Sequence, residues 1–243
     1  MQEVRPGVFI TRTRHSANSY LIFAETGPRA VLVDPGSVAG AGDLIRTLVA
    51  YGLRPNDLVA ILLTHTHPDH AGAAAQLWEW SGAPVYVHPA ELGRLRQGSG
   101  PPLRWLGRLR IPPVPDAKPL ADGASVPGFE SLVAVHTPGH SPGHLCFFLP
   151  EQRIVFLGDL LLRVDGRLAR PVGLFGRQGE LHLASLKRLL RLGAEAACFG
   201  HGEPILRGFS VQLATFLEGL RPEPEWLRLL RHLPDLLRFG LGT

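Results

Sequence analysis

The stretch 58–70 reads LVAILLTHTHPDH: an apolar run, Leu58–Leu63, followed by three histidines and one aspartate in the six positions His65–His70. A short apolar run that ends in polar residues predicts a buried strand. The histidines and Asp69 then occupy the loop at the carboxyl end of that strand, where side chains from a short segment can converge. Imidazole and carboxylate groups on a rigid turn predict a divalent transition-metal site, most often zinc, with iron and manganese as alternatives.

Three further predicted strands also end in ligand-type residues, each next to a glycine. They are strand 132–135 before His140, strand 153–157 before Asp159, and strand 196–199 before His201. Glycine at a strand end permits the tight turn that aims the next side chain inward. Four strand ends with such residues predict a single site on loops at the edge of a rigid sheet.

In this order, the motifs resemble those of the metallo-β-lactamase-fold hydrolases, of the glyoxalase II-like type. The resemblance extends from Val8 to about Leu206. It rests on Asp34 in Leu-Val-Asp-Pro-Gly, the His65–His70 cluster, His140 in Thr-Pro-Gly-His, Asp159 in Gly-Asp, and His201 in Gly-His-Gly. It implies an α+β fold, a four-layer αββα sandwich in which helices flank two packed mixed β-sheets.

The same resemblance implies a dinuclear metal centre and a role for each residue in it. The implied ligands are His65, His67 and His140 on the first metal and Asp69, His70 and His201 on the second, with Asp159 bridging. Asp34 and His144 are expected just outside the ligands, where Asp34 would orient a ligand or bound water and His144 would support the loop or contact substrate. Asp69 and Asp159 are the expected catalytic residues for proton transfer.

The activity expected from this centre is hydrolysis of an ester or thioester by metal-bound hydroxide, because a metal lowers the pKa of bound water toward ~7. Two subfamilies fit less well. Hydroxyacylglutathione hydrolases usually carry a Gly-rich, cysteine-containing loop after the bridging aspartate and end in Gly-His-Glu-Tyr, where this chain has Gly200-His201-Gly202-Glu203. Lactonases share the motif at 137–144 but use a tyrosine after the bridging aspartate, and the tyrosines here are Tyr20, Tyr51 and Tyr86.

Two other reactions of the same fold are alternatives. Persulfide dioxygenases bind one iron through two histidines and an aspartate, which His65, His140 and Asp159 would supply. RNA phosphodiesterases of this fold are suggested by five arginines in 94–110, but Pro68 stands where those nucleases usually carry glycine. A small-molecule substrate, anionic if these arginines contact it, is therefore expected in preference to nucleic acid.

The composition predicts a single domain over 1–243, because a chain of 243 residues with 45% hydrophobic content can bury a sizeable core. The N-terminal sequence resembles no signal peptide, and no apolar run approaches the ~20 residues of a membrane span. Cys146 and Cys198, both in predicted strands, are expected as buried free thiols. These features predict a cytoplasmic protein without a membrane partner, and a dimer is left open.

The remaining pattern predicts alternating strands and helices. The strands are 8–11, 20–23, 30–33, 85–88 and 145–149, and the helices are 41–50, 71–80, 180–192, 213–220 and 225–237, with a further helix that begins at Pro89 and ends near Arg94. The segment 95–120 is rich in proline and arginine and is expected to be an irregular excursion, such as a lid. The last two helices place the C-terminal helical region at about 210–240.

Overall fold

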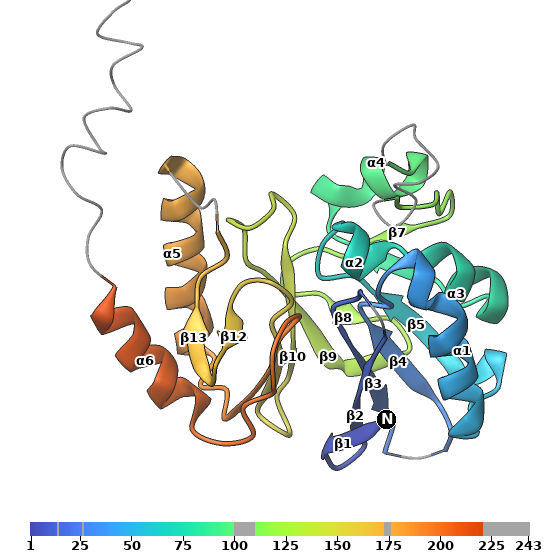
Figure 1. Cartoon of the computed structure of the whole chain (residues 1–243), viewed down its shortest axis with the longest axis horizontal. Coiled ribbons are helices and arrows are strands. Elements are labelled where there is room, and N and C mark those ends of the chain that lie inside the picture. The colour runs from blue at the N-terminus through green and yellow to red at the C-terminus, as the bar shows by residue number, and fades with distance from the viewer. Residues whose placement is uncertain (14, 26, 100–109, 173–175, 221–243) are drawn as a thin grey trace, which may run out of the picture.

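The computed structural model describes residues 1–13, 15–25, 27–99, 110–172 and 176–220 (Figure 1). Its larger sheet has seven strands in the order β1 (Gln2–Arg5), β2 (Val8–Arg12), β3 (Asn18–Phe23), β4 (Ala30–Val33), β5 (Leu58–Leu62), β6 (Val85–Val87) and β7 (Lys118–Pro119). Strands β1 to β4 are antiparallel, and β4 to β7 are parallel. The sheet is therefore mixed, as predicted.

A second mixed sheet has five strands in the order β14 (Ala196–Cys198), β11 (Ile154–Phe156), β10 (Leu145–Leu149), β9 (Phe129–His136) and β8 (Ser125–Val126). Only the pair β11–β14 is parallel. A separate hairpin consists of β12 (Leu162–Val164) and β13 (Arg167–Ala169). The sheet and the hairpin together carry the second half of the motifs.

Helices cover the outer faces of both sheets (Figure 1). On the seven-stranded side lie α1 (Ala41–Ala50), α2 (Pro68–Ala71), α3 (Ala74–Ser81) and α4 (Pro89–Gln97), together with the short 3₁₀ turns η1 (Val38–Gly40) and η2 (Pro55–Asp57). On the five-stranded side lie α5 (Gly176–Arg191) and α6 (Phe209–Gly219). In the described residues, no helix combines the length and the apolar character needed to cross a membrane.

Three separate apolar clusters fill the three interfaces between these layers. In β4, Val31 and Val33 face the other sheet, whereas Leu32 packs with Leu44 and Leu48 of α1. This alternation follows from the strand's two-residue period. The third cluster joins the five-stranded sheet to α5 and α6 through side chains that include Cys146, Leu186, Leu189, Phe209 and Leu213. The predicted four-layer αββα sandwich is confirmed.

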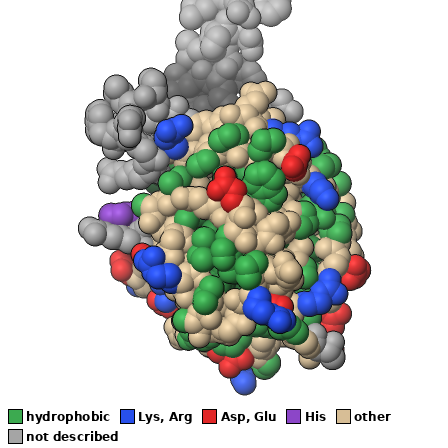
Figure 2. All heavy atoms as spheres, turned by 90° about the vertical axis from the view of Figure 1, so that its right-hand side faces the viewer, with side chains coloured by type: hydrophobic (Ala, Val, Ile, Leu, Met, Phe, Trp, Pro, Cys, Tyr) green, Lys and Arg blue, Asp and Glu red, His purple; other side chains and the backbone are tan. Residues whose placement is uncertain are grey.

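The outer face of the seven-stranded side is mixed in character (Figure 2). Apolar side chains lie there between scattered acidic and basic ones, and the coloured residues of this view form no continuous basic patch. Two large apolar side chains near the end of α1, Val49 and Tyr51, are about half exposed.

Several predicted elements differ in their bounds. The helix predicted over 71–80 is two helices, α2 and α3, because Ala73 N donates to Gly36 O at 2.8 Å instead of continuing the first helix. Strand β6 ends at Val87, since His88 caps α4 by accepting a hydrogen bond from Ala90 N at Nδ1 (3.2 Å). Helix α4 continues three residues beyond the predicted Arg94.

The predicted excursion 95–120 is only partly described. The first three residues of this segment belong to α4. Residues 118–119 form the edge strand β7, and the prediction missed this strand. Residues 100–109 and the predicted helix 225–237 lie outside the described residues. The predicted helix 213–220 corresponds to α6, which begins four residues earlier.

Candidate metal centre

The strand ends that were predicted to carry ligands meet where the two sheets adjoin. The loop after β5 carries two of the histidines, α2 carries Asp69 and His70, and the other three residues follow β9, β11 and β14. The parallel strand pairs β4–β5 and β11–β14, one from each sheet, point their carboxyl ends to this place. The fold thus brings together the seven residues predicted as ligands: His65, His67, Asp69, His70, His140, Asp159 and His201.

The first group consists of His65, His67, His140 and Asp159, whose ligand-type atoms all lie within 4.8 Å of one another. His140 Nε2 lies 3.2 Å from His65 Nε2 and 3.0 Å from His67 Nδ1. Nitrogens bound at 2.0–2.1 Å to a tetrahedral zinc are separated by about 3.3 Å. The nitrogen of His140 therefore lies at the spacing that a shared cation requires from each of the other two imidazoles.

The second group consists of Asp69, His70 and His201, which satisfy the same 4.8 Å limit. Asp69 Oδ2 lies 3.1 Å from His201 Nε2 and 3.8 Å from His70 Nε2. His70 is fully buried, whereas the side chains of Asp69 and His201 are 37% and 42% exposed. This group is therefore the more accessible of the two.

Asp159 faces both groups with different oxygens. Its Oδ2 lies 3.7 Å from His140 Nε2 in the first group. Its Oδ1 lies 3.3 Å from His70 Nε2 and 3.7 Å from His201 Nε2 in the second. One carboxylate oxygen thus points to each group, which is the arrangement a bridging ligand needs.

Two buried atoms between the groups make no hydrogen bond. They are His70 Nε2 and Asp159 Oδ1, which face each other at 3.3 Å without the alignment of a hydrogen bond. A buried polar atom without a partner costs about 1–3 kcal/mol. A cation at this position would satisfy both atoms, so the residues present fit a metal.

The protonation of the first group also suits metal binding. Burial, followed by the neighbouring His70, holds the pKa of His65 well below its ordinary value. Burial likewise lowers the pKa of His140 to about 4, although Asp159 opposes it. These imidazoles are therefore neutral near pH 7, and neutral imidazole is the form that binds a metal.

Asp34 contacts the second group through the Nδ1 atom of His70. Its Oδ2 accepts hydrogen bonds from His70 Nδ1 (2.8 Å) and Thr64 Oγ1 (2.7 Å), and its Oδ1 accepts from Thr64 N (2.8 Å). A carboxylate on Nδ1 fixes the tautomer that leaves the Nε2 lone pair free for a metal. The hydroxyl oxygen of Thr64, Oγ1, also lies 3.0 Å from His65 Nδ1. Sequence reasoning missed Thr64, although it stands next to the motif.

His144 lies beneath the turn that carries Asp159. It is fully buried, its Nε2 accepts a hydrogen bond from Asp159 N at 3.2 Å, and its Nδ1 lies 2.9 Å from Thr137 Oγ1. Of the two roles expected for His144, this burial favours support of the loop over contact with substrate.

Gly200 is required by close packing within the centre. A Cβ atom at this position would lie 2.5 Å from Asp159 Oδ1 and 2.6 Å from His70 Cε1. Those distances leave no room for any side chain. The glycine before His201 thus allows the second group to close around its neighbours.

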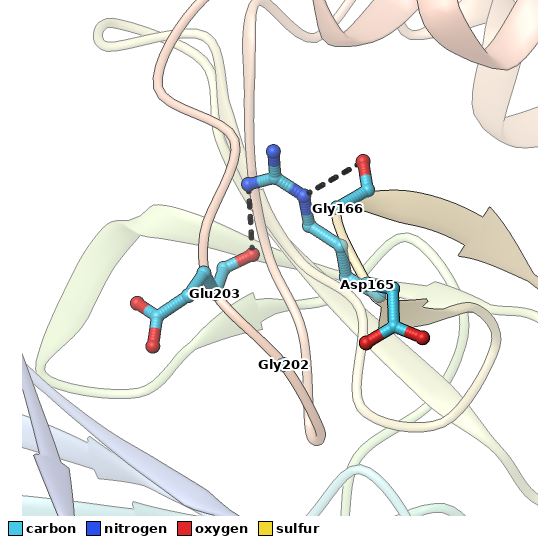
Figure 3. Close-up of a pocket in the computed structure, with 5 residues that line it drawn as sticks. Asp165, Gly166, Gly202 and Glu203 are labelled. Atoms are coloured by element: carbon cyan, nitrogen blue, oxygen red, sulfur yellow. Dashed lines mark hydrogen bonds between the residues drawn. The ribbon is translucent and has the colours of Figure 1, made fainter.

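A cavity of about 320 Å³ is lined by Gly202 and Glu203, the two residues that follow His201, and by Arg163, Asp165 and Gly166 (Figure 3). Arg163 crosses it from β12, donating to Glu203 O (3.3 Å) and to Gly166 O (3.5 Å), and its backbone N donates to His201 O (3.0 Å). The carboxylates of Asp165 and Glu203 lie on either side (Figure 3). The hairpin β12–β13, which was not predicted, therefore forms one wall next to the second group.

The four-layer fold and the two facing groups of ligand-type residues are those of a metallo-hydrolase class of protein. The chain belongs to the metallo-beta-lactamase superfamily, whose family model matches residues 12–201. The predicted superfamily is thus confirmed. The probable metallo-hydrolase YqgX of Bacillus subtilis (strain 168) is 33% identical over 213 residues, which are 80% of this chain and 94% of that protein.

Two further relatives bear on the chemistry. A hydroxyacylglutathione hydrolase of Fuscovulum blasticum is 32% identical over 185 residues, 75% of this chain and 61% of that protein. The solved structure of TTHA1623 in a di-iron-bound form is 39% identical with a TM-score of 0.66, and the match covers 82% of this chain and 94% of that one. The chain is therefore similar to metallo-hydrolases over most of its length.

Proposed function

We propose that this protein is a metal-dependent hydrolase that cleaves an ester or thioester at a centre of two divalent ions. The observation that carries the proposal is the carboxylate of Asp159, which points one oxygen toward each group. The relatives support the reaction type, since one is a probable metallo-hydrolase and another a hydroxyacylglutathione hydrolase, an enzyme that acts on a thioester.

The ligand assignment follows the two groups. We assign His65, His67 and His140 to the first ion, Asp69, His70 and His201 to the second, and Asp159 to both. Zinc is the metal that the sequence predicts, and the di-iron form of TTHA1623 makes iron the second metal to test. Asp34 and His144 hold the ligands His70 and Asp159 in place.

When bound, two divalent ions polarise a carbonyl and lower the pKa of water, so that attack on an acyl group proceeds near neutral pH. The chain itself must then accept and return a proton. Asp69 suits this role because its side chain is 37% exposed and contacts the imidazoles through Oδ2 alone. Asp159 is only 11% exposed and uses both oxygens, so we assign it to bridging.

The substrate that we propose is small. The cavity of about 320 Å³ at Gly202 and Glu203, which follow His201 in the chain, lies at the lower end of the range for small-molecule sites. Because the chain has Gly202-Glu203 after His201 where hydroxyacylglutathione hydrolases usually have Glu-Tyr, we propose an acyl ester or thioester without assigning glutathione.

A mononuclear iron dioxygenase is the second candidate. It would use His65, His140 and Asp159, which share the first group. We rank it second because Asp69 and His201 would then have no ligand role, although they lie 3.1 Å apart at the centre. Consumption of dioxygen with a persulfide substrate and one iron per chain would favour it over hydrolysis.

The experiment that tests the hydrolase combines elemental analysis of the purified protein with a screen of thioester, lactone and phosphodiester substrates. His65→Ala and Asp159→Ala should each lose metal and abolish turnover, because each removes a ligand of the centre. His15→Ala, which changes an exposed histidine outside both groups, should keep both. Full turnover by the metal-free Asp159→Ala protein would contradict the proposal.

A further inference from the structure

A buried carboxylate outside both groups links the loops that carry the first one. Glu91, in the first turn of α4, is only 5% exposed. Its Oε2 accepts a hydrogen bond from Thr66 Oγ1, and its Oε1 accepts one from Gly143 N at 3.2 Å. Both carboxylate oxygens are thus engaged by residues that lie 25 and 52 positions away in the chain.

The two partners of Glu91 belong to different halves of the sandwich. Thr66 stands between His65 and His67 on the loop after β5, in the seven-stranded sheet. Gly143 lies three residues after His140 on the connection from β9 to β10, in the five-stranded sheet. Since the first group draws its three imidazoles from these two loops, Glu91 spans the junction on which their separation depends.

Packing leaves the carboxylate little freedom. A Cβ atom at Gly143 would lie 2.6 Å from Glu91 Cγ and 3.0 Å from His88 Nδ1, so the glycine backbone lies directly against the glutamate. Burial raises the pKa of Glu91, but the hydroxyl groups of Thr66 and Ser141, the Gly143 backbone and the charge of Arg94 together outweigh it and leave this pKa below its ordinary value. Glu91 is therefore ionised near neutral pH, and removing it would leave two buried donors without an acceptor.

We propose that Glu91 is a positioning residue of the metal centre, which holds the Thr66 and Gly143 loops together and so sets the distance from His65 and His67 to His140. The inference rests on the proposed function in one respect, the assignment of these three histidines to the first ion. Glu91 touches neither a ligand atom nor the cavity of about 320 Å³ in the described contacts. Its influence on the metal is therefore indirect.

The test compares Glu91→Ala with Glu91→Gln, using Co²⁺ as a spectroscopic probe. Alanine removes both acceptors, so the affinity for the first Co²⁺ should fall by about 10-fold or more, with an altered visible absorption spectrum. Glutamine keeps an oxygen for Gly143 N and an amide that donates to Thr66 Oγ1. Its cobalt affinity should stay within about threefold of wild type, the size of a modest hydrogen-bond difference.

A matched control separates positioning from general loss of stability. Asp57 is also a 5% exposed carboxylate, and it pairs with Arg54 at the opposite end of β5 from the centre. Asp57→Ala should lower the melting temperature but leave cobalt affinity and spectrum unchanged. Equal cobalt loss in Asp57→Ala and Glu91→Ala would overturn the proposal, and so would wild-type cobalt binding by Glu91→Ala.

If Glu91→Ala does not fold, Thr66→Val provides the decisive variant, because it removes only the hydroxyl donor to Glu91. It should weaken cobalt binding in the same direction, and unchanged binding would again overturn the inference. The two proposals fail separately. A wild-type protein that binds two Co²⁺ ions but cleaves no ester or thioester contradicts the hydrolase alone, whereas normal turnover with normal cobalt binding by Glu91→Ala contradicts Glu91 alone.

Discussion

Nδ1 of His70 lies 2.8 Å from Oδ2 of Asp34, and both side chains are buried. The opposite nitrogen of the same ring, Nε2, faces Oδ1 of Asp159 at 3.3 Å. Burial lowers the pKa of His70, but the carboxylates of Asp159 and Asp34 raise it more, so this pKa lies well above its ordinary value in the metal-free protein. The hydrogen bond to Asp34 therefore holds the imidazole in one orientation, with Nε2 turned toward Asp159.

Replacement of Asp34 by alanine should weaken the second metal site. The substitution removes the acceptor that fixes the His70 tautomer, and such losses typically cost about 10- to 100-fold in metal affinity. Competition with a chromophoric chelator measures the change. Asp43→Ala, at an exposed carboxylate on α1, serves as the control and should bind metal like the wild type. An unchanged affinity in Asp34→Ala would show that the contact does not orient the ligand.

Replacement of Gly200 by alanine should disrupt the centre even though no ligand is changed. The added methyl group would lie 2.5 Å from Asp159 Oδ1, so this carboxylate or the backbone must shift. We expect loss of bound metal by elemental analysis and a matching loss of turnover. Gly219→Ala, where a Cβ atom meets nothing within 4 Å, is the control for the substitution itself. Full metal content in Gly200→Ala would contradict the packing argument.

His182 should make the metal-free protein less stable in acid. It is fully buried, its Nε2 donates to Leu160 O at 2.6 Å, and burial lowers its pKa from 6.5 to about 4. Between these values the unfolded chain binds a proton that the folded chain does not. Stability should therefore be unaffected above about pH 6.5 and fall as the pH drops toward about 4, by up to about 3 kcal/mol.

Urea unfolding with EDTA present, at about pH 7.5 and about pH 4.5, measures this dependence. His182→Gln keeps a donor for Leu160 O but cannot titrate, so it should lose less stability on acidification than the wild type does. His15→Gln, at an exposed histidine, should follow the wild-type dependence. The same loss in His182→Gln as in the wild type would rule out His182 as the source.

Replacement of Tyr20 by phenylalanine should cost stability without affecting the metal. The Tyr20 hydroxyl donates to Phe199 O at 2.7 Å, and Asn18 Nδ2 donates to the same oxygen at 3.0 Å. Because the second bond remains, the loss should be about 1 kcal/mol, as for a single neutral hydrogen bond. Thermal unfolding measures the stability, and a large drop in metal content in Tyr20→Phe would contradict the prediction that only stability is affected.

Local patterns predicted much of the fold. Helix α1 and strand β4 have the predicted bounds, since each is long or apolar enough for its periodicity to show in the sequence. The hairpin β12–β13 and the edge strands β7 and β8 have two or three residues per strand, too few for a period to emerge. The division between α2 and α3 depends on a contact with Gly36, and a local pattern cannot report it.

The sequence predicted the seven residues that meet at the candidate site but not all of the residues that contact them from outside. The seven residues that meet at the centre stand in recognisable motifs at strand ends, and the structure places them together. Thr64 and Glu91 were missed because threonine and glutamate occur widely for other reasons, and only the folded chain shows what they touch. Motifs thus predicted the residues that meet at the candidate centre, whereas some of the residues that contact its loops from outside required the tertiary structure.

The location of the centre at the junction of the two sheets has a consequence for the whole molecule. His65, His67 and His70 follow strands of one half, and His140, Asp159 and His201 follow strands of the other, so a bound cation acts as a cross-link between them. Ligand binding to the native state alone stabilises it by mass action. Bound metal should therefore raise the melting temperature of the protein, and removal of metal by a chelator should lower it.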